Sequence, residues 1–273
     1  MTDAIADHYA DDGIAERILA AVRATLPPGA PITPDVLAAA DQLHGRGLAA
    51  TKELAALLDA KPGDRVLDIG SGVGGPARWI AWHCGAHVTG IDLTEAFCRA
   101  AVALNAATGM EDRVTIVHGS ALALPFADAS FDRAYSHNVV MNIEDKPAFY
   151  RETWRVLKPG AKLVLMNIAA GDTGTAHYPT PWTASAATSF LATPEQTRTD
   201  LVACSFEIVS FLDTSDIARA ARRAQQSRLA SGPAPALGTH LVMGDRVPEL
   251  QANVIRSEEA GALRTVEVLL RRP

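Results

Sequence analysis

The sequence predicts an α/β protein built on a doubly wound, mostly parallel seven-stranded sheet, with an N-terminal helical cap and C-terminal inserted helices. Two observations predict it. From about residue 65 onward, short apolar segments of strand length alternate with longer segments of helical spacing, and glycine or proline turns separate them. Residues 1–60 show helical spacing only, so we expect the cap there and the sheet domain over residues 61–273.

Three helices are expected in the cap. Apolar residues at helical spacing predict a first helix over 14–24. Thr33 before Pro34 has the chemistry of an N-cap followed by proline at the first helical position, which predicts a second helix over 34–43. A third helix, over 49–58, is expected to end before a Pro-Gly turn.

The next hundred residues show a strand–helix alternation, which requires right-handed crossovers and therefore a parallel sheet. We expect strands at 65–69, 87–91, 113–118, 132–136 and 162–168, and helices at 76–83, 95–108 and 146–157. The turn sequence Lys158-Pro159-Gly160 is expected to separate the last of these helices from the strand that follows it.

The C-terminal hundred residues predict inserted helices around two further strands, at 207–211 and 263–270. A helix from Thr193, which has a capping-box glutamine three residues later, leads into the first of these strands. The segment between the two strands is too long for a simple crossover, so a lid element is expected at about 213–260. A second lid element is expected at about 171–192, after the fifth strand. The basic run there is expected to form one solvated helix face; it comprises Arg219, Arg222, Arg223 and Arg228.

Composition excludes several classes of protein. The 273 residues are 48% hydrophobic and 21% charged, with a net charge of −6 and no block of like charges. Nucleic acid is therefore not expected as a partner, because counterion release needs a concentrated basic surface. The three cysteines form no C-x-x-C pair, and no apolar run reaches the ~18 residues of a membrane span. We expect a cytoplasmic protein without a membrane partner, either a monomer or a homodimer.

The glycine-rich turn at residues 66–75 is the strongest chemical signal in the chain. Its glycines allow a tight turn to pass a ligand with no Cβ in the way. Gly70, Gly72 and Gly75 also satisfy G-x-G-x-x-G, the pattern of dinucleotide-binding, Rossmann-like domains. Asp92, at the end of the second strand, suits ribose hydroxyls in either case. These features alone leave NAD and S-adenosylmethionine (SAM) both open.

Asp68 favours SAM. It lies two residues before Gly70, where a dinucleotide-binding fold usually carries an apolar residue. A carboxylate there is unfavourable beside a pyrophosphate and suits a cationic, methionine-type ligand. The segment 119–122 follows the third strand, where an adenine edge would lie. An NAD-dependent oxidoreductase, the alternative enzyme, would need a constellation such as Tyr-x-x-x-Lys, and the sequence contains none.

With these motifs the sequence resembles the class I SAM-dependent methyltransferases over roughly residues 60–170. The segment 68–78 and the downstream Leu157-Lys158-Pro159-Gly160 are similar to the small-molecule branch, which includes glycine/sarcosine, sterol, quinone-biosynthesis and natural-product sugar methyltransferases. The resemblance implies transfer of a methyl group from SAM to a nitrogen or oxygen of a small molecule by in-line displacement, with S-adenosylhomocysteine as product. A non-catalytic SAM-binding protein stays as an alternative.

The resemblance also implies which residues hold the cofactor. Gly70, Gly72 and Gly74 would line the methionine and ribose portions. Asp92 would hold both ribose hydroxyls, and Ala121 would offer its backbone N–H to the adenine. Ser120 stands where the family usually has an acidic residue, and its hydroxyl can still accept from the adenine amino group. The expected cofactor set is Asp68, Gly70, Ser71, Gly72, Gly74, Asp92, Leu93, Ser120, Ala121, Leu122 and His137.

The acceptor is expected where the fourth strand ends, because ligands collect at the carboxyl ends of parallel strands. His137, Asn138 and Met141 should therefore face the reacting methyl group. Methyl transfer depends mostly on alignment, but a hydroxyl acceptor benefits from a general base. His137 is the first candidate base, with an orienting role toward SAM as the alternative. His44, from the cap, is the second candidate, with a structural role beside Gly45 as its alternative.

Further acceptor contacts are expected from outside the sheet. Tyr9 in the cap would fold over the methionine end, although a tyrosine there could equally belong to the core. Trp182 and Phe190 lie in a long loop after the fifth strand, and such loops are usually functional. No cluster of carboxylates or histidines has metal-ligand spacing, so no metal is expected.

Overall fold

The computed structural model of the chain describes residues 13–231 and 235–273. A seven-stranded sheet has the order β3-β2-β1-β4-β5-β7-β6. β1 to β5 run parallel, and β7 is antiparallel to both β5 and β6. The doubly wound, mostly parallel seven-stranded sheet is therefore confirmed. The strands are β1 Arg65–Ile69, β2 His87–Asp92, β3 Val114–His118, β4 Phe131–His137, β5 Leu157–Ala170, β6 Glu207–Asp213 and β7 Leu263–Arg271.

Helices cover the sheet and extend beyond it. They are α2 Ile14–Thr25, α3 Pro34–Asp41, α4 Leu48–Leu58, α5 Gly75–Cys84, α6 Glu95–Thr108, α7 Lys146–Val156, α8 Pro194–Ala203, α9 Ser215–Ser231, α10 His240–Met243 and α11 Val247–Glu259. Thr33 caps α3 through its hydroxyl, which accepts from the Val36 N–H, and Thr193 caps α8 in the same way. Both predicted N-caps are thus confirmed.

Two apolar layers sandwich the sheet, because successive residues of a strand face opposite sides. Leu67 and Ile69 of β1 belong to the core that includes residues of α7 and α8. Val66 belongs to the opposite core, which α4 and α5 cover. From β1, in the middle of the sheet, the chain runs outward through β2 to β3 and then returns to β4, which lies on the other side of β1. This reversal places the switch point between β1 and β4, where open α/β sheets bind ligands.

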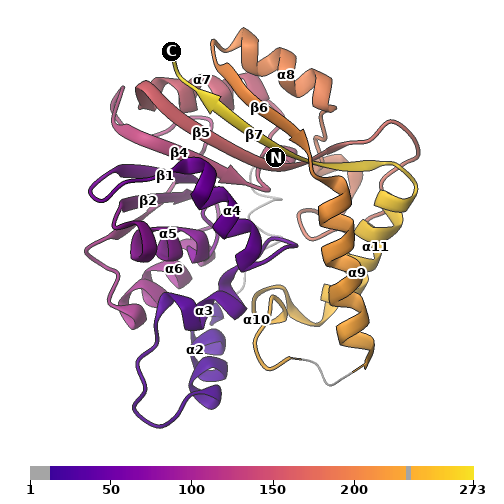
Figure 1. Cartoon of the computed structure of the whole chain (residues 1–273). Coiled ribbons are helices and arrows are strands. Elements are labelled where there is room, and N and C mark those ends of the chain that lie inside the picture. The colour runs from indigo at the N-terminus through magenta and orange to yellow at the C-terminus, as the bar shows by residue number, and fades with distance from the viewer. Residues whose placement is uncertain (1–12, 232–234) are drawn as a thin grey trace.

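The N-terminal and C-terminal helices come together away from the sheet. Figure 1 shows α9 and α11 along one side of the molecule, with α10 near the lower end beside α2. A third apolar cluster joins α2, α3, α6 and α10. Arg17 Nε also donates to the carbonyl of Leu241, at 3.1 Å. The predicted division at residue 60 falls between α4 and β1. Because α2 and α3 pack against α10, the cap contacts the C-terminal helices directly.

Two predicted boundaries are wrong. Helix α3 ends at Asp41, not at residue 43, because Gln42 is already extended and the Asp41 carboxylate is held by a side chain of α5. The Lys158-Pro159-Gly160 segment lies inside β5, not before it. Leu157 pairs with Phe131 across the sheet, and the Gly160 N–H donates to the carbonyl of Arg272 at 2.7 Å, so the extended backbone is hydrogen-bonded there.

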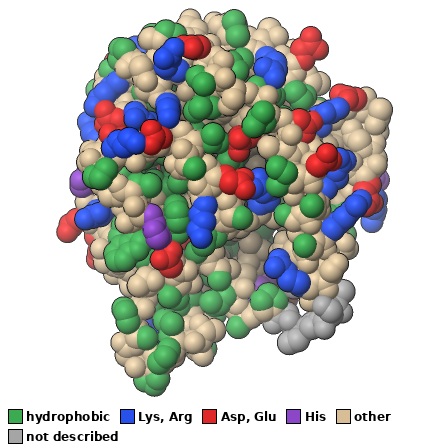
Figure 2. Space-filling model, in the orientation of Figure 1, with side chains coloured by type: hydrophobic (Ala, Val, Ile, Leu, Met, Phe, Trp, Pro, Cys, Tyr) green, Lys and Arg blue, Asp and Glu red, His purple; other side chains and the backbone are tan. Residues whose placement is uncertain are grey.

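The prediction of one solvated arginine face on α9 is wrong for Arg222. Its side chain is buried and forms an ion pair with Glu258 of α11. Glu258 lies 36 residues further along the chain, so the basic run alone carries no sign of this partner. On the face in Figure 2, Lys and Arg side chains are interspersed with Asp and Glu. None of the helices in residues 13–231 and 235–273 combines the length and apolarity of a membrane-crossing segment.

Arg78 of α5 is fully buried and connects the cap to the sheet domain. Its guanidinium donates to the Asp41 carboxylate at 2.9 Å and to the Asn105 side chain of α6 at 3.0 Å. It also donates to the carbonyls of Val73, in the glycine turn, and of Ala101. Burial lowers the pKa of Arg78, and the neighbouring Asp41 charge opposes that shift. The charge therefore stays, and it depends on Asp41.

Removing Asp41 should destabilise the whole chain. Asp41→Ala leaves the Arg78 charge buried without its partner, which we expect to lower the free energy of unfolding by about 3 to 5 kcal/mol in urea titrations. Glu249→Ala, which breaks the exposed Arg246–Glu249 pair, is the matched control and should leave the free energy of unfolding close to that of the wild type. Equal losses in the two variants would contradict the role given to Arg78.

Candidate active site

A cavity of about 300 Å³ opens at the switch point of the sheet. Almost all of the predicted site residues line it, although they come from six separate segments of the chain. The predicted residues on its wall are His44, Asp68, Gly70, Ser71, Gly72, Asp92, Leu93, Ser120, Ala121, Leu122, His137, Asn138, Met141, Trp182 and Phe190. Gly74 is not among the lining residues, and Tyr9 lies outside the described residues.

The glycine turn brings β1 to the cavity through a backbone that needs Gly70. Its φ is +81°, and a Cβ there would lie 2.2 Å from Cγ2 of Val139. The Gly70 and Ser71 N–H groups both donate to the carbonyl of Ile91, at 2.8 and 3.1 Å. The turn is therefore fixed to the end of β2, with Gly72 on the cavity wall.

Gly74 is not among the cavity-lining residues, and the contacts that the structure shows for it are structural. It is the N-cap of α5, with φ of +77°, and a Cβ there would lie 2.8 Å from Nη1 of Arg78. At Gly75, a Cβ would lie 2.2 Å from the carbonyl oxygen of Asp41. The last two glycines of the motif thus make room for the contact between α5 and the cap.

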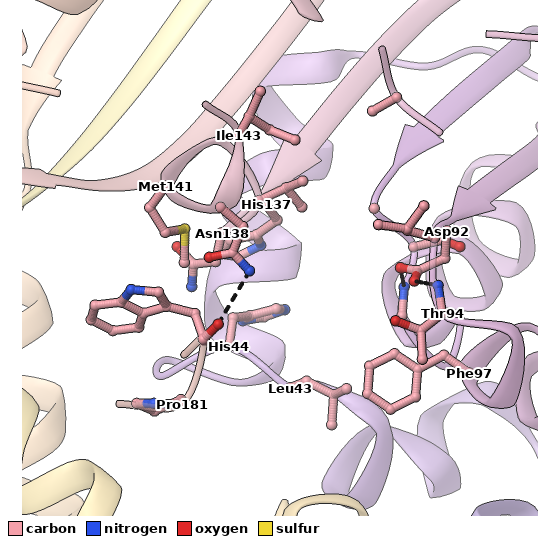
Figure 3. Close-up of a pocket in the computed structure, with 18 of the residues that line it drawn as sticks. Leu43, His44, Asp92, Thr94, Phe97, His137, Asn138, Met141, Ile143 and Pro181 are labelled. Carbon is pink, nitrogen blue, oxygen red and sulfur yellow. Dashed lines mark hydrogen bonds between the residues drawn. The ribbon is translucent and has the colours of Figure 1, made fainter. Parts of the chain in front are cut away.

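Asp92 ends β2 and holds the glycine turn from the other side. Its Oδ2 accepts from the Gly72 N–H at 2.7 Å, and its Oδ1 accepts from the Thr94 N–H at 2.9 Å. Burial raises the pKa of Asp92, and these two backbone bonds oppose that shift. Figure 3 shows Asp92, Thr94 and Phe97 together on one side of the cavity. This arrangement leaves further carboxylate lone pairs for a ligand with hydroxyl donors.

Asp68 is a buried carboxylate with an unsatisfied atom. It is 2% exposed, and its Oδ2 has no hydrogen-bond partner in the described chain. Burial raises the pKa of Asp68 to about 7, the tyrosine beside it, Tyr135, opposes the shift, and the charge of Asp92 adds to it. A buried acidic group without a hydrogen-bond partner on a cavity wall destabilises the free protein. It therefore favours binding of a ligand that brings hydrogen-bond donors or positive charge.

The loop after β3 forms the end of the cavity expected to hold adenine. The Ser120 hydroxyl accepts from the Leu122 N–H at 3.2 Å, so one of its lone pairs is used inside the loop. His118 contacts the carbonyl of Leu93 through Nε2, at 2.9 Å. Phe97, one turn into α6, also lines this end, and no motif pointed to it.

The opposite end of the cavity has an apolar wall tied to the end of β4. The Phe190 N–H donates to the carbonyl of Met141 at 2.7 Å, and Asn142 Nδ2 donates to the carbonyl of Trp182 at 3.3 Å. Asn253 of α11 donates to the carbonyl of Pro179 in the same loop, at 2.9 Å. The long loop therefore has a defined position against the sheet and the lid. Trp182 is 4% exposed and packs among Met141, Ile168, Val254 and Leu263.

The two candidate bases lie against each other. The rings of His44 and His137 stack with centroids 3.8 Å apart and an interplanar angle of 18°. Burial lowers the pKa of His44 to about 3, and the positive charge of Arg46 adds to the shift. Burial, then His44 and Arg46, lower the pKa of His137 well below its usual value. Both rings are neutral at physiological pH, so each has a nitrogen lone pair.

The lid supplies lining residues that sequence patterns did not single out. Arg222, Met243, Gln251 and Val254 come from the segment 215–259 and reach the cavity. No sequence pattern indicates these residues, because contacts made by helices so distant in sequence leave no local pattern. Across residues 13–231 and 235–273, no group of three or more His, Cys, Asp or Glu side chains is arranged to hold a metal ion.

The parallel sheet, the glycine turn beside an acidic β2 terminus and the cavity over the switch point define the class I methyltransferase fold. A methyltransferase-domain family model matches residues 67–165. Residues 67–165 therefore match a methyltransferase domain, and the resemblance to the class I SAM-dependent methyltransferases seen in the motifs is confirmed. These findings do not favour the oxidoreductase alternative.

Known proteins extend this similarity. Over 113 residues the chain is 46% identical to 24-methylenesterol C-methyltransferase 2 of Oryza sativa subsp. japonica, a match that covers 41% of this chain and 31% of the relative. The chain thus matches about a third of that relative's length. The geranyl diphosphate C-methyltransferase of Streptomyces coelicolor A3(2) superposes with a TM-score of 0.71 at 16% identity, covering 99% of this chain and 97% of the other. The [4+2]-cyclase SpnF gives a TM-score of 0.66 at 25% identity, covering 82% and 81%.

Asp68→Asn should stabilise the free protein at alkaline pH. The folded-state pKa of Asp68 is raised, so the folded chain binds its proton more tightly than the unfolded chain. The proton on Asp68 therefore adds to the free energy of unfolding at low pH, and this contribution is lost as pH rises through about 7. We expect the amide variant to gain about 4 kcal/mol in the free energy of unfolding at pH 8 and progressively less toward pH 5, measured by urea unfolding without ligand. A difference that does not change with pH would contradict this.

Proposed function

We propose that this protein transfers a methyl group from SAM to a nitrogen or oxygen of a small-molecule acceptor. One observation carries the proposal. A single cavity joins the glycine turn and Asp92 at one end to the stacked histidines and the Trp182 wall at the other. A nucleoside and an acceptor can therefore meet inside it, and alignment of that kind supplies much of the rate of a displacement reaction.

The residues of the first end fit SAM. Asp92 presents carboxylate oxygens toward a ribose, and the orphaned Oδ2 of Asp68 suits the ammonium of a methionine moiety. When bound, SAM supplies an electrophilic methyl group on a positively charged sulfur. The chain's own residues hold it by the ribose and the amino group, and the lid and cap keep bulk water out of the cavity.

The other end fits a partly apolar acceptor. Met141, Ile143, Pro181, Trp182 and Phe190 form most of its wall, while Asn138 and the two histidines are polar. The relatives support this, since one is named for a sterol substrate and another is a geranyl diphosphate methyltransferase. We place acceptor specificity in the loop at 171–192 and in the lid helices at 213–260, with residues 1–60 as a cap. We also propose a cytoplasmic protein that acts as a monomer or a homodimer.

The likeness to a [4+2]-cyclase favours one further candidate, a SAM-binding protein that transfers no methyl group. Formation of S-adenosylhomocysteine separates the two. Incubation of the protein with SAM and a metabolite extract should release S-adenosylhomocysteine, measured by mass spectrometry. Tight SAM binding without any such release would favour the non-catalytic candidate.

Calorimetry with SAM and with NAD tests the cofactor. We expect SAM to bind and NAD not to bind. Asp92→Ala removes two charge-assisted ribose contacts and should weaken SAM binding about 100-fold. Asp112→Ala, an exposed carboxyl in the turn before β3, is the control and should bind SAM like the wild type. Binding of NAD in place of SAM would refute the proposed cofactor.

The acceptor wall is tested with a pair of tryptophans. Trp182→Phe should raise the KM for the acceptor about tenfold while the Kd for SAM changes less than twofold, because Trp182 lies at the acceptor end only. Trp82→Phe is the matched control, since Trp82 is 49% exposed on α5 and should leave both constants unchanged. A change in SAM binding alone would contradict the position of Trp182 at the acceptor end.

A further inference from the structure

A buried chain of hydrogen bonds runs from Arg78 to the acceptor end of the cavity. Arg78 donates to Asp41 Oδ2 at 2.9 Å, and Gln42 Nε2 donates to Asp41 Oδ1 at 3.0 Å. The Thr51 hydroxyl donates to Gln42 Oε1. His44 Nε2 lies 3.1 Å from the same Thr51 oxygen. All five side chains are at most 8% exposed, so water does not compete for these bonds.

The chain of bonds has one consistent assignment of protons. The Asp41 carboxylate only accepts, so the Gln42 amide must turn its NH₂ group to it and its carbonyl oxygen to Thr51. The single hydroxyl proton of Thr51 is then used on Gln42. Thr51 can only accept from His44, and Nε2 of His44 must therefore carry the ring proton. This leaves the lone pair of His44 on Nδ1.

That lone pair has no protein partner. Nδ1 of His44 is buried and unpaired in the described chain, and the His44 side chain forms part of the cavity wall. The stacked ring of His137 restrains the plane of His44, and the bond to Thr51 restrains its rotation. Figure 3 shows His44 beside His137 and Asn138 at the acceptor end, across the cavity from Asp92.

We propose that His44 Nδ1 accepts the proton of the acceptor's nucleophilic O–H or N–H group, and that the Arg78–Asp41–Gln42–Thr51 chain holds His44 in the required tautomer. The proposal rests on the proposed methyl transfer and narrows its substrates to acceptors with a proton on the nucleophile. His44 is then the catalytic residue, and Thr51 and Gln42 are positioning residues.

The step conserves atoms and charge. An oxygen or nitrogen lone pair of the acceptor forms a bond to the methyl carbon, while the carbon–sulfur bond breaks and its electron pair stays on sulfur. The proton on the nucleophile passes to His44 Nδ1. The positive charge of the sulfonium thereby becomes the charge of the His44 imidazolium, so the buried site gains no net charge. The proton leaves to water once the products are released.

His137, the first candidate from the sequence, lacks this arrangement. Its Nδ1 is also buried and without a partner, but none of the contacts found in the described residues fixes the proton on its other nitrogen. The two adjacent rings do not readily act as two bases, because a positive charge on one ring disfavours a positive charge on the other. We therefore assign His137 to holding the ring of His44.

The tautomer is measured directly by long-range ¹H–¹⁵N NMR of the full-length protein with ¹⁵N-labelled histidine, with the His44 signals assigned by comparison with His44→Gln. The wild type should show a protonated Nε2 and an unprotonated Nδ1 at pH 7. In Thr51→Val, which has the shape of threonine without its hydroxyl, the population should shift toward the other tautomer. A wild-type His44 with its proton on Nδ1 overturns the proposal.

Activity provides the second test, with a panel of a phenol, a catechol, a primary amine, a secondary amine and an olefin that lacks a protic nucleophile. We expect S-adenosylhomocysteine formation with protic acceptors, a loss of about 100-fold in kcat for His44→Gln, and about tenfold for Thr51→Val. Thr51→Ser restores the hydroxyl and should recover kcat to within about threefold of wild type. The Kd for SAM should change less than twofold in all three.

The two failures are distinguishable. No SAM binding, or no S-adenosylhomocysteine with any acceptor, refutes the proposed methyl transfer and with it the role of His44 as a base, whatever the tautomer. Turnover that is undiminished in Thr51→Val or His44→Gln overturns the further inference and leaves the proposed function intact. Turnover that occurs only with the olefin overturns both the further inference and the proposed transfer to nitrogen or oxygen, while methyl transfer from SAM still stands.

Discussion

The buried charge of Arg78 is the constraint on which the site depends. A guanidinium without solvent must find anionic and carbonyl partners, and here they come from the cap, the glycine turn and α6. One side chain therefore fixes the distance between three elements that surround the cofactor end of the cavity. The glycines at 74 and 75 serve the same contact, because any Cβ there would meet Arg78 or the Asp41 backbone.

The same ion pair extends its influence to the acceptor end. Asp41 is the fixed acceptor that orients Gln42, and Gln42 in turn determines the proton positions on Thr51 and His44. A structural charge pair and a candidate base are thus parts of one network. Buried polar networks are most stable when their members are satisfied, and two nitrogens of this one, Arg78 Nε and His44 Nδ1, have no partner in the described chain. His44 Nδ1 is the one that carries a free lone pair, and it is the proton acceptor that we propose.

Electrostatics divide the cavity into two ends. At the cofactor end, the buried carboxyl of Asp68 and the half-buried carboxyl of Asp92 have raised pKa values, so the free protein carries a cost that a cationic ligand removes. At the acceptor end, burial keeps His44 and His137 neutral beside an apolar wall. A positive charge is therefore favoured at one end and a proton acceptor is available at the other, which matches a reaction that converts a sulfonium to a thioether and releases a proton.

Sequence patterns alone predict the sheet, the glycine turn and most of the residues that line the proposed cofactor end of the cavity. Those features depend on period-two and helical spacing and on residues close together along the chain, such as Asp68 and Gly70. Such local patterns can be recognised in the amino-acid sequence alone. Tertiary structure alone decided the roles of Gly74, Arg222 and His44. Arg222 is neutralised by Glu258, which lies 36 residues further along the chain. Gly74 and His44 are both placed by the ion pair between Asp41 and Arg78, whose residues are 37 apart: Arg78 packs over the turn at Gly74, and Asp41 begins the hydrogen bonds that lead to His44. Burial and hydrogen bonding between distant segments leave no local pattern, so only the folded chain shows that His44, and not His137, has its ring proton placed by a hydrogen-bond network.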